Sequence, residues 1–187
     1  LQVAEKDEKK YSGQFVNSAL SLSKDNSSAA IIGGGDGGIA RELLSKGFDL
    51  IDWYELDPEV VKVCQKHLPK ICGDVKANNN VKTYWGDAFE SIKKVKDSKY
   101  DKIYVDLNDD QFCINLAAKN MKGLKRILKP GGVITAQVGC LSKKPKQVKN
   151  WMDLLQTNFG NVKLTETFIP SFDCRWNFAS SCMKQNN

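Results

Sequence analysis

The chain has 187 residues, a length that fits one domain. Hydrophobic residues make up 41% and charged residues 27%, which are ordinary globular values that exclude a disordered chain. The net charge is +6, but the lysines are scattered along the chain. The densest run, Lys143 to Lys149, has no interleaved aromatic residues. We therefore interpret this run as a solvated face and expect no nucleic-acid partner.

Apolar, β-rich runs alternate with helical patterns along the chain. The predicted strands are 29–32, 50–54, 81–85, 102–105, 133–138, 163–169 and 176–182. The predicted helices are 39–45, 58–68, 89–95, 112–128 and 145–157. This alternation predicts right-handed crossovers and a parallel sheet covered on both faces. Because the gap at 170–175 is short enough for a hairpin, we predict an α/β fold with a Rossmann-like doubly wound sheet, mostly parallel, with one antiparallel edge strand.

The N-terminus and the cysteines bear on the cell compartment. The segment LQVAEKDEKKY lacks the apolar core of a signal peptide, and no apolar run approaches the roughly 18 residues of a membrane span. We therefore expect a cytoplasmic protein with no membrane partner, whose six cysteines are buried free thiols. His67 is the only histidine, so we expect no metal site. Since the chain does not begin with Met, we expect it to be processed, excised or part of a longer protein.

A glycine-rich loop follows the first predicted strand. In a doubly wound sheet, ligands bind beyond the carboxyl ends of the strands, near the switch point. The segment GGGDGG at 33–38 fits the pattern G-x-G-x-x-G between a strand and a helix. Glycines such as Gly33 and Gly35 let the backbone approach a ligand, and the central Asp36 suits a cationic ligand group rather than a phosphate. The alternative is a tight turn in which Asp36 caps the next helix.

Acidic residues follow the second and third predicted strands. Glu55 is placed to accept hydrogen bonds from both hydroxyls of a ribose. Its alternative role is to cap the helix that begins at Pro58, although Asp57 is better placed for that role. Asp87 can accept a hydrogen bond from the exocyclic amine of adenine, and capping of the next helix is the equal alternative.

Three carboxylates lie within five residues after the fourth predicted strand. Asp106, Asp109 and Asp110 follow a buried run, and mutual repulsion raises the pKa of such neighbours. We expect these residues and Asp36 to face one mouth, which would be negative on a protein that is basic overall. Such a cleft selects a cationic substrate, whereas a solvated acidic loop is the alternative.

Together these motifs resemble the polyamine aminopropyltransferases, the spermidine/spermine synthase family. The segments that carry the resemblance are IIGGGDGG, WYELDPEVV, WGDAF, YVDLNDD, LKPGG and ITAQVG. It runs from Gln2 to about Cys182, and the stretches 70–75 and 169–178 resemble the spermine synthase branch in particular. The resemblance implies a methyltransferase-type Rossmann-like catalytic domain at 29–187, preceded at 1–28 by the end of the family's N-terminal hairpin region and a linker.

The resemblance also implies a reaction. Decarboxylated S-adenosylmethionine would be the co-substrate, with no permanently bound cofactor, and would donate its aminopropyl group to a polyamine while methylthioadenosine is released. Spermidine is the expected acceptor and putrescine the alternative. A small-molecule polyamine and a nucleoside substrate are thus the expected partners. A homodimer is also an expectation, although the hairpin region that the family uses for dimerisation does not precede Gln2 in this sequence.

Residue roles carry over from the family position by position. Asp106 matches the catalytic aspartate, which deprotonates and orients an attacking amine that is no nucleophile while protonated. Asp36 matches the acid that holds the donor's aminopropyl amine, and it would repel the carboxylate of ordinary S-adenosylmethionine. The remaining matches are Gln2, Gly33, Gly35, Glu55, Asp87 and Ala88 on the donor side, and Tyr11 and Asp109 on the acceptor side.

Departures from the family concern the acceptor. Phe172 stands where the family usually has Tyr, and Asp173 stands one place from a Glu of the spermine synthase branch. We expect Asp173 to reach the far amine of spermidine, with a surface turn residue as the equal alternative. Two other functions stay open, an S-adenosylmethionine-dependent methyltransferase and a non-catalytic domain that binds nucleosides or polyamines.

Overall fold

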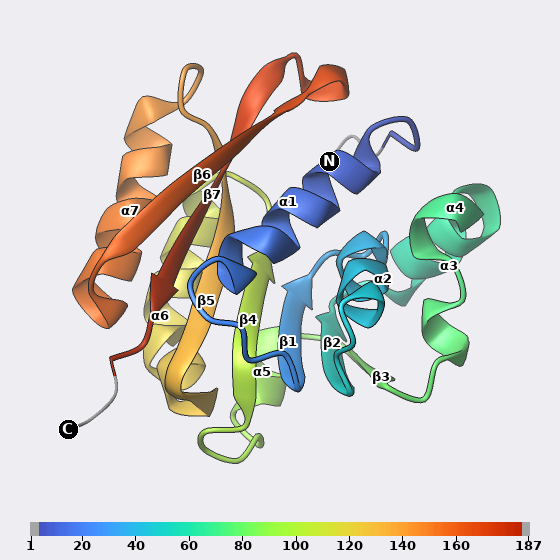
Figure 1. The fold of residues 1–187 in the computed structure, drawn as a ribbon, viewed down its shortest axis with the longest axis horizontal. Helices are drawn as coiled ribbons and strands as arrows, with labels where there is room; N and C mark the ends of the chain where they lie inside the picture. Colours follow the sequence, from blue (N-terminus) through green and yellow to red (C-terminus); the bar gives the residue numbers. More distant parts are fainter. Residues whose placement is uncertain (1–3, 185–187) are drawn as a thin grey trace.

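The computed structural model describes residues 4–184, which form a seven-stranded sheet with helices on both faces (Figure 1). The strand order is β3-β2-β1-β4-β5-β7-β6. Strands β1 to β5 pair in parallel, and β7 runs antiparallel to both β5 and β6. The mostly parallel sheet, with one antiparallel strand in the hairpin at its edge, confirms the predicted fold class. The strands are β1 Ser28–Gly33, β2 Leu50–Glu55, β3 Val81–Trp85, β4 Tyr100–Asp106, β5 Leu128–Cys140, β6 Val162–Ile169 and β7 Cys174–Cys182.

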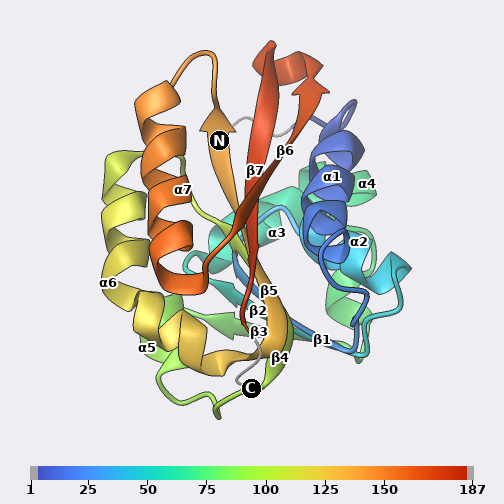
Figure 2. The same cartoon turned by 60° about the vertical axis from the view of Figure 1, so that its left-hand side comes forward.

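Two groups of helices cover the two faces of the sheet (Figure 2). Helices α1, α2 and α3 pack on one face, and α5, α6 and α7 pack on the other. The helices are α1 Glu8–Leu20, α2 Gly38–Ser45, α3 Pro58–His67, α4 Pro69–Cys72, α5 Ala88–Ile92, α6 Gln111–Ile127 and α7 Pro145–Phe159, with 3₁₀ turns η1 Val75–Ala77 and η2 Pro170–Phe172. Within residues 4–184, no helix is long and apolar enough to cross a membrane.

The central strand β1 shows why this sequence forms a two-faced sheet. Ala29 and Ile31 face the helices α1 and α2, whereas Ala30 and Ile32 face the opposite helix layer. All four side chains are fully buried. A strand covered on both faces reads as a continuous apolar run, because successive side chains alternate between the faces. The core is therefore two clusters separated by the sheet.

Helix α1 is the main element that the sequence analysis did not predict. Its buried face includes Ser12, Phe15, Val16 and Ala19, which follow the helical spacing of i, i+3, i+4 and i+7. Its first turn carries the buried Glu8, and charged residues there make the segment resemble a solvated terminus. Residues 1–28 therefore contain a helix that packs on the sheet, while the boundary at residue 28 stays a prediction.

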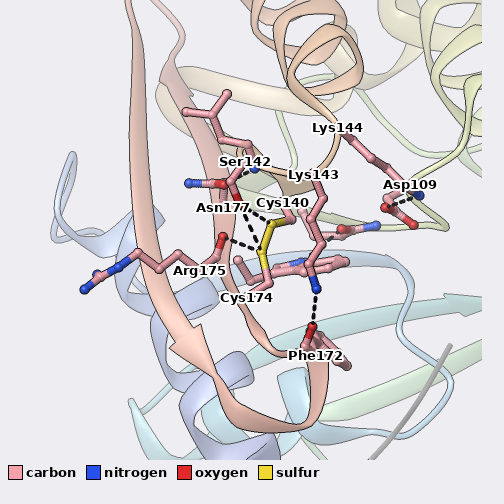
Figure 3. Close-up of a disulfide and its surroundings, with 12 residues drawn as sticks. Asp109, Cys140, Ser142, Lys143, Lys144, Phe172, Cys174, Arg175 and Asn177 are labelled. Carbon is pink, nitrogen blue, oxygen red and sulfur yellow. Dashed lines mark hydrogen bonds and ion pairs between the residues drawn. A yellow bond between two sulfur atoms is a disulfide. The ribbon is translucent and has the colours of Figure 1, made fainter.

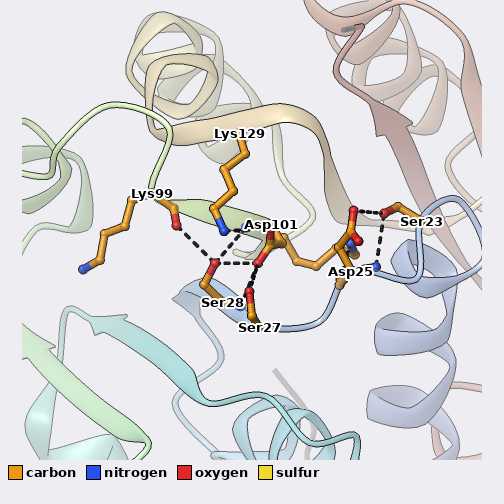
Figure 4. Close-up of polar contacts among 8 residues, drawn as sticks. Ser23, Asp25, Ser27, Ser28, Lys99, Asp101 and Lys129 are labelled. Carbon is orange, nitrogen blue, oxygen red and sulfur yellow. Dashed lines mark hydrogen bonds and ion pairs between the residues drawn. The ribbon is translucent and has the colours of Figure 1, made fainter.

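A polar cluster joins the amino ends of three strands, at the end of the sheet away from the predicted site (Figure 4). The carboxylate of Asp101 on β4 accepts hydrogen bonds from the Ser27 hydroxyl at 2.6 Å and the Ser28 amide at 2.9 Å. Lys129 at the start of β5 donates to the other oxygen at 2.9 Å. Burial opposes ionisation, but the hydrogen bonds from Lys129, Ser27 and Ser28 outweigh it and lower the pKa of Asp101 to about 2.

The cysteines correct one prediction from the sequence. Cys140, at the end of β5, and Cys174, at the start of β7, form a disulfide across 34 positions of the chain. Their Cα atoms lie 6.3 Å apart, within the usual range for a disulfide. The expectation of six free thiols was therefore wrong for this pair, because the strand pairing that brings the two residues together is not visible in their sequence spacing. Cys64, Cys72 and Cys113 are free and buried, as predicted.

Candidate active site

The carboxyl ends of β1 and β4 meet at the point where the strand order reverses. Gly33 and Asp106 are register partners across these two strands. Gly33 has a φ of +86°, and a Cβ atom there would lie 2.5 Å from the carbonyl oxygen of Asp106. Only glycine fits this close backbone approach. The structure thus places the glycine-rich loop beside Asp106, as the strand-end argument predicted.

Asp106 is a buried carboxylate, 8% exposed, at the end of β4. The Tyr11 hydroxyl donates a hydrogen bond of 2.6 Å to its Oδ1, across 95 positions of the chain. Burial, followed by the negative charge of Asp36, raises the pKa of Asp106 to about 7 despite that hydrogen bond. A carboxyl group with a pKa in this range can hold or release a proton near neutral pH.

Asp36 lies at the start of α2 and belongs to the same acidic group. Its Oδ1 accepts a hydrogen bond of 2.9 Å from the amide of Gly38, the first residue of α2, so the capping contact that was the alternative for Asp36 is present. Burial raises the pKa of Asp36 to about 6, although the hydrogen bond from the Gly38 amide stabilises the ionised carboxylate and opposes this rise. The side chain also lines the cavity described below, so it combines a local structural contact with a position that a ligand can reach.

Glu55 lies at the carboxyl end of β2, next to the glycine-rich loop. A Cβ atom on Gly35 would lie 3.1 Å from Glu55 Oε2. Asp57, and not Glu55, caps α3 by accepting from the Glu59 amide at 2.8 Å, which leaves Glu55 free of that role. Burial raises the pKa of Glu55, although backbone amides oppose the shift. Its Oε1 accepts a hydrogen bond of 3.0 Å from the Asp57 amide, and its contact with a ribose stays a prediction.

Asp87 and Ala88 form the junction between β3 and α5. Asp87 Oδ1 accepts a hydrogen bond of 2.8 Å from the Phe89 amide and caps α5, and Ala88 is the first residue of that helix. The capping alternative for Asp87 is therefore correct. It leaves the second carboxylate oxygen available, so the proposed adenine contact remains a prediction.

A cavity of about 420 Å³ opens at this end of the sheet. Its walls are acidic and aromatic, and they come from α1, the glycine-rich loop, the loop after β4 and the β6–β7 hairpin. The rings of Phe172 and Trp176 lie 4.7 Å apart between centroids, and Tyr11 packs edge-on against Phe172 at 6.1 Å. The lining residues are Ala4, Asp7, Glu8, Tyr11, Asp36, Asn108, Asp109, Gln137, Ile169, Ser171, Phe172 and Trp176.

The carboxylates after β4 take different roles. Asp109 lines the cavity, and Lys144 forms an ion pair with its Oδ2 at 2.9 Å (Figure 3). Lys144 therefore pairs with a residue of the cavity wall and does not only belong to a solvated face. Asp110 caps α6 through the Cys113 amide at 2.8 Å. The expectation that Asp110 faces the common mouth is thus corrected, because its carboxylate satisfies the first turn of the helix.

The disulfide ties the β6–β7 hairpin to the end of β5 (Figure 3). Lys143 reinforces this junction by donating to the Phe172 carbonyl at 3.1 Å. Asp173 follows in the same connection with a left-handed φ of +45°, exposed and outside the cavity lining. The geometry favours the turn alternative for Asp173, whose acceptor role stays a prediction. Gln2 lies outside the described residues.

Sequence reasoning predicted Tyr11 of α1 but missed two acidic residues at the start of this helix. Asp7 and Glu8 line the cavity, and both are buried. Glu8 forms an ion pair with Arg41 at 2.8 Å and accepts from Ser12. The signal that could have found Asp7 is its spacing of four residues from Tyr11 and eight from Phe15, which places the three on one helix face.

Known proteins resemble this chain in sequence and in fold. Residues 8–187 match the family model described as the spermine/spermidine synthase domain. Polyamine aminopropyltransferases of Prochlorococcus marinus strains MIT 9301 and AS9601 are 36% and 34% identical over 186 residues, which cover 94% of this chain and 64% of each relative. The chain thus spans 64% of the length of these curated relatives.

Solved structures share the fold. A spermidine synthase in complex with the transition-state analogue AdoDATO superposes with a TM-score of 0.90 at 19% identity, covering 99% of this chain and 64% of that one. The spermidine synthase from Thermotoga maritima gives 0.89 at 20% identity, covering 99% and 63%. Sequence match, fold and the acidic strand-end site lead to one conclusion: the chain belongs to the spermine/spermidine synthase family.

Proposed function

We propose that this chain carries the reaction centre of a polyamine aminopropyltransferase. The observation that carries the proposal is the buried Asp106, with a pKa raised to about 7 by burial and the charge of Asp36, next to an acidic and aromatic cavity. An acidic cavity favours a polycationic acceptor, and the aromatic walls provide surfaces for its methylene groups and ammonium groups.

The donor would be decarboxylated S-adenosylmethionine, bound along the carboxyl ends of β1, β2 and β3. Glu55 would accept from the ribose hydroxyls, and Asp87 with Ala88 would contact the adenine. Gly33 and Gly35 would allow the backbone to approach the nucleoside, and Asp36 would hold the aminopropyl ammonium. From β3 through β2 to β1, these contacts would run from the adenine through the ribose to the aminopropyl group. Such an order is expected of a nucleoside that lies across the ends of a parallel sheet.

The acceptor amine would bind between Tyr11, Asp106 and Asp109. Its nitrogen attacks the aminopropyl carbon next to the sulfonium, so a new C–N bond forms while the C–S bond breaks. The C–S electron pair stays on sulfur, which leaves neutral methylthioadenosine. Asp106 takes the proton that the acceptor nitrogen must lose, and positioning of the two substrates supplies up to roughly 7–11 kcal/mol of the barrier.

Spermidine is the acceptor that we propose, with putrescine as the alternative. The support is the resemblance of residues 70–75 and 169–178 to the spermine synthase branch. The homodimer and the cytoplasmic location stay predictions from the sequence.

The test is incubation of the purified chain with each donor in turn, together with spermidine or putrescine. Methylthioadenosine formed from the decarboxylated donor supports the proposal, and the acceptor that is consumed identifies the branch. S-adenosylhomocysteine formed from S-adenosylmethionine would identify a methyltransferase instead. Binding of nucleoside or polyamine without either product would indicate a non-catalytic domain.

A further inference from the structure

Asp7 is a buried carboxylate that faces the acceptor side of the cavity. It is 4% exposed, and it lines the cavity together with Tyr11, Phe172 and Trp176. Its oxygens accept from the Ser171 amide at 2.7 Å and the Ser171 hydroxyl at 3.0 Å. These donors are neutral. Across residues 4–184, no lysine, arginine or histidine forms an ion pair with Asp7.

The neighbouring carboxylates differ from Asp7 in this respect. Lys144 pairs with Asp109, and Arg41 pairs with Glu8. A buried charge without a counter-charge is unfavourable, and a cationic ligand would supply one. Of the carboxylates that line the cavity, Asp7 and Asp36 lack a cation within the described chain, and Asp36 is assigned to the donor. Asp7 is therefore the acid available to an acceptor ammonium that does not react.

Helix geometry sets the distance at which Asp7 would act. Asp7 and Tyr11 lie four residues apart, which is about 6 Å along a helix axis. Tyr11 marks the reacting position, since its hydroxyl donates to Asp106. The walls near these two residues include the rings of Phe172 and Trp176, which suit methylene groups. A carboxylate set apart from the reacting position in this way fits a flexible amine whose second nitrogen follows a short alkyl chain.

We propose that Asp7 binds the second ammonium group of the acceptor, the one joined by a short methylene chain to the attacking nitrogen. This inference rests on the proposed function, and it adds a specificity-determining residue to the acceptor side. It predicts that the site takes aliphatic amines with at least two nitrogens and discriminates against monoamines.

The main competing role for Asp7 is structural, because its contacts with Ser171 hold the β6–β7 hairpin against α1. The two roles respond differently to the acceptor. A purely structural change would alter the use of a monoamine and a diamine alike. Loss of an ammonium contact would alter only the use of the diamine.

The test compares 1,4-diaminobutane with n-butylamine as acceptors, using the wild type, Asp7→Asn and Ser171→Ala. Asp7→Asn removes the charge and keeps an oxygen for Ser171, so we expect KM for the diamine to rise about 10- to 100-fold. The KM for n-butylamine should stay within about two-fold. Ser171→Ala, the matched control, loosens the hairpin contact but keeps the charge of Asp7. It should change the KM for the two amines by the same factor. An equal change of both amines in Asp7→Asn, or no change, would overturn the inference.

A second variant and a binding measurement test the inference independently of Asp7→Asn and of turnover. Asp7→Glu keeps the charge but extends it by one methylene, and it should shift the preference towards 1,3-diaminopropane; an unchanged preference would count against the inference. Calorimetric titration of the same amines in the presence of methylthioadenosine needs no turnover. Discrimination by Asp7 without any transfer would leave the inference standing and refute the proposed function, whereas turnover without such discrimination would do the reverse.

Discussion

Replacing Asp106 with Asn should raise the stability of the protein and suppress its turnover. The carboxylate of Asp106 is 8% exposed, and burial and the charge of Asp36 raise its pKa from the ordinary 3.8 to about 7. In Asp106→Asn, the amide oxygen can still accept the hydrogen bond from Tyr11, but the side chain no longer ionises. The substitution therefore removes the buried charge with little change in shape.

The magnitude follows from proton linkage. Because the folded-state pKa is raised, the stability associated with Asp106 is fully present below pH 3.8 and is lost as the pH rises through about 7. Each pKa unit is worth about 1.4 kcal/mol, so the wild type loses up to about 4 kcal/mol over this window. Asp106→Asn does not undergo this loss. The variant should be more stable than the wild type by an amount that grows between about pH 4 and about pH 8.

The assay is denaturant unfolding of both proteins across this pH range, together with turnover at neutral pH. Removal of a positioned base should lower kcat by roughly 10²–10⁴-fold. Asp101→Asn is the matched control, since the pKa of Asp101 is lowered to about 2 by Lys129, Ser27 and Ser28 against the effect of burial. Its stabilisation is present above pH 3.8 and lost as the pH falls through about 2, so Asp101→Asn should destabilise the protein at neutral pH by about 2 kcal/mol. A stability difference for Asp106→Asn that does not depend on pH, or a near-normal kcat, would refute the reasoning.

Three further predictions concern the rest of the site. Asp36→Ala should weaken binding of the decarboxylated donor by more than the roughly 0–1 kcal/mol of a surface pair and reduce the discrimination against S-adenosylmethionine, as measured by calorimetry; an unchanged preference between the donors would contradict the role of Asp36. Cys140→Ser should lower the free energy of unfolding by about 3–4 kcal/mol, because the disulfide closes a loop of 34 positions, whereas Cys182→Ser, at a free thiol, should have a small effect. Asp173→Asn should leave KM for both spermidine and putrescine unchanged if this exposed residue only forms a turn, and a rise for spermidine alone would establish the predicted contact with its far amine.

The sequence by itself was sufficient to predict the sheet and to identify the residues at the carboxyl ends of its strands. Six of the seven strands were predicted within two residues at each end, because apolar runs and glycine or proline breaks are local signals. The exception is β5, which begins at Leu128, five residues before the predicted start. In a parallel sheet, the carboxyl ends of neighbouring strands share one edge. The proximity of Gly33, Glu55 and Asp106 therefore followed from topology and strand position, without knowledge of any side-chain contact.

The contacts that complete the site depend on the tertiary structure. Tyr11 reaches Asp106 across 95 positions, and Asp7 reaches Ser171 across 164. Both contacts require α1 to lie over the carboxyl end of the sheet, and the local sequence of α1 contains no information on where it docks. Packing of Phe15 against the sheet places this helix, because burial of apolar surface is not directional and depends on the complementary surface that the rest of the chain forms.

The same distinction applies to charge. The sequence placed Asp106, Asp109 and Asp110 in one acidic loop. Only the folded chain shows that Asp106 has a raised pKa, that Asp109 pairs with Lys144 and that Asp110 caps α6. A carboxylate is tuned by its burial and by the donors that reach it, and both are properties of the packed structure. Residue type and spacing therefore determined that acids gather at this edge of the sheet, and tertiary packing decided which of them could take part in chemistry.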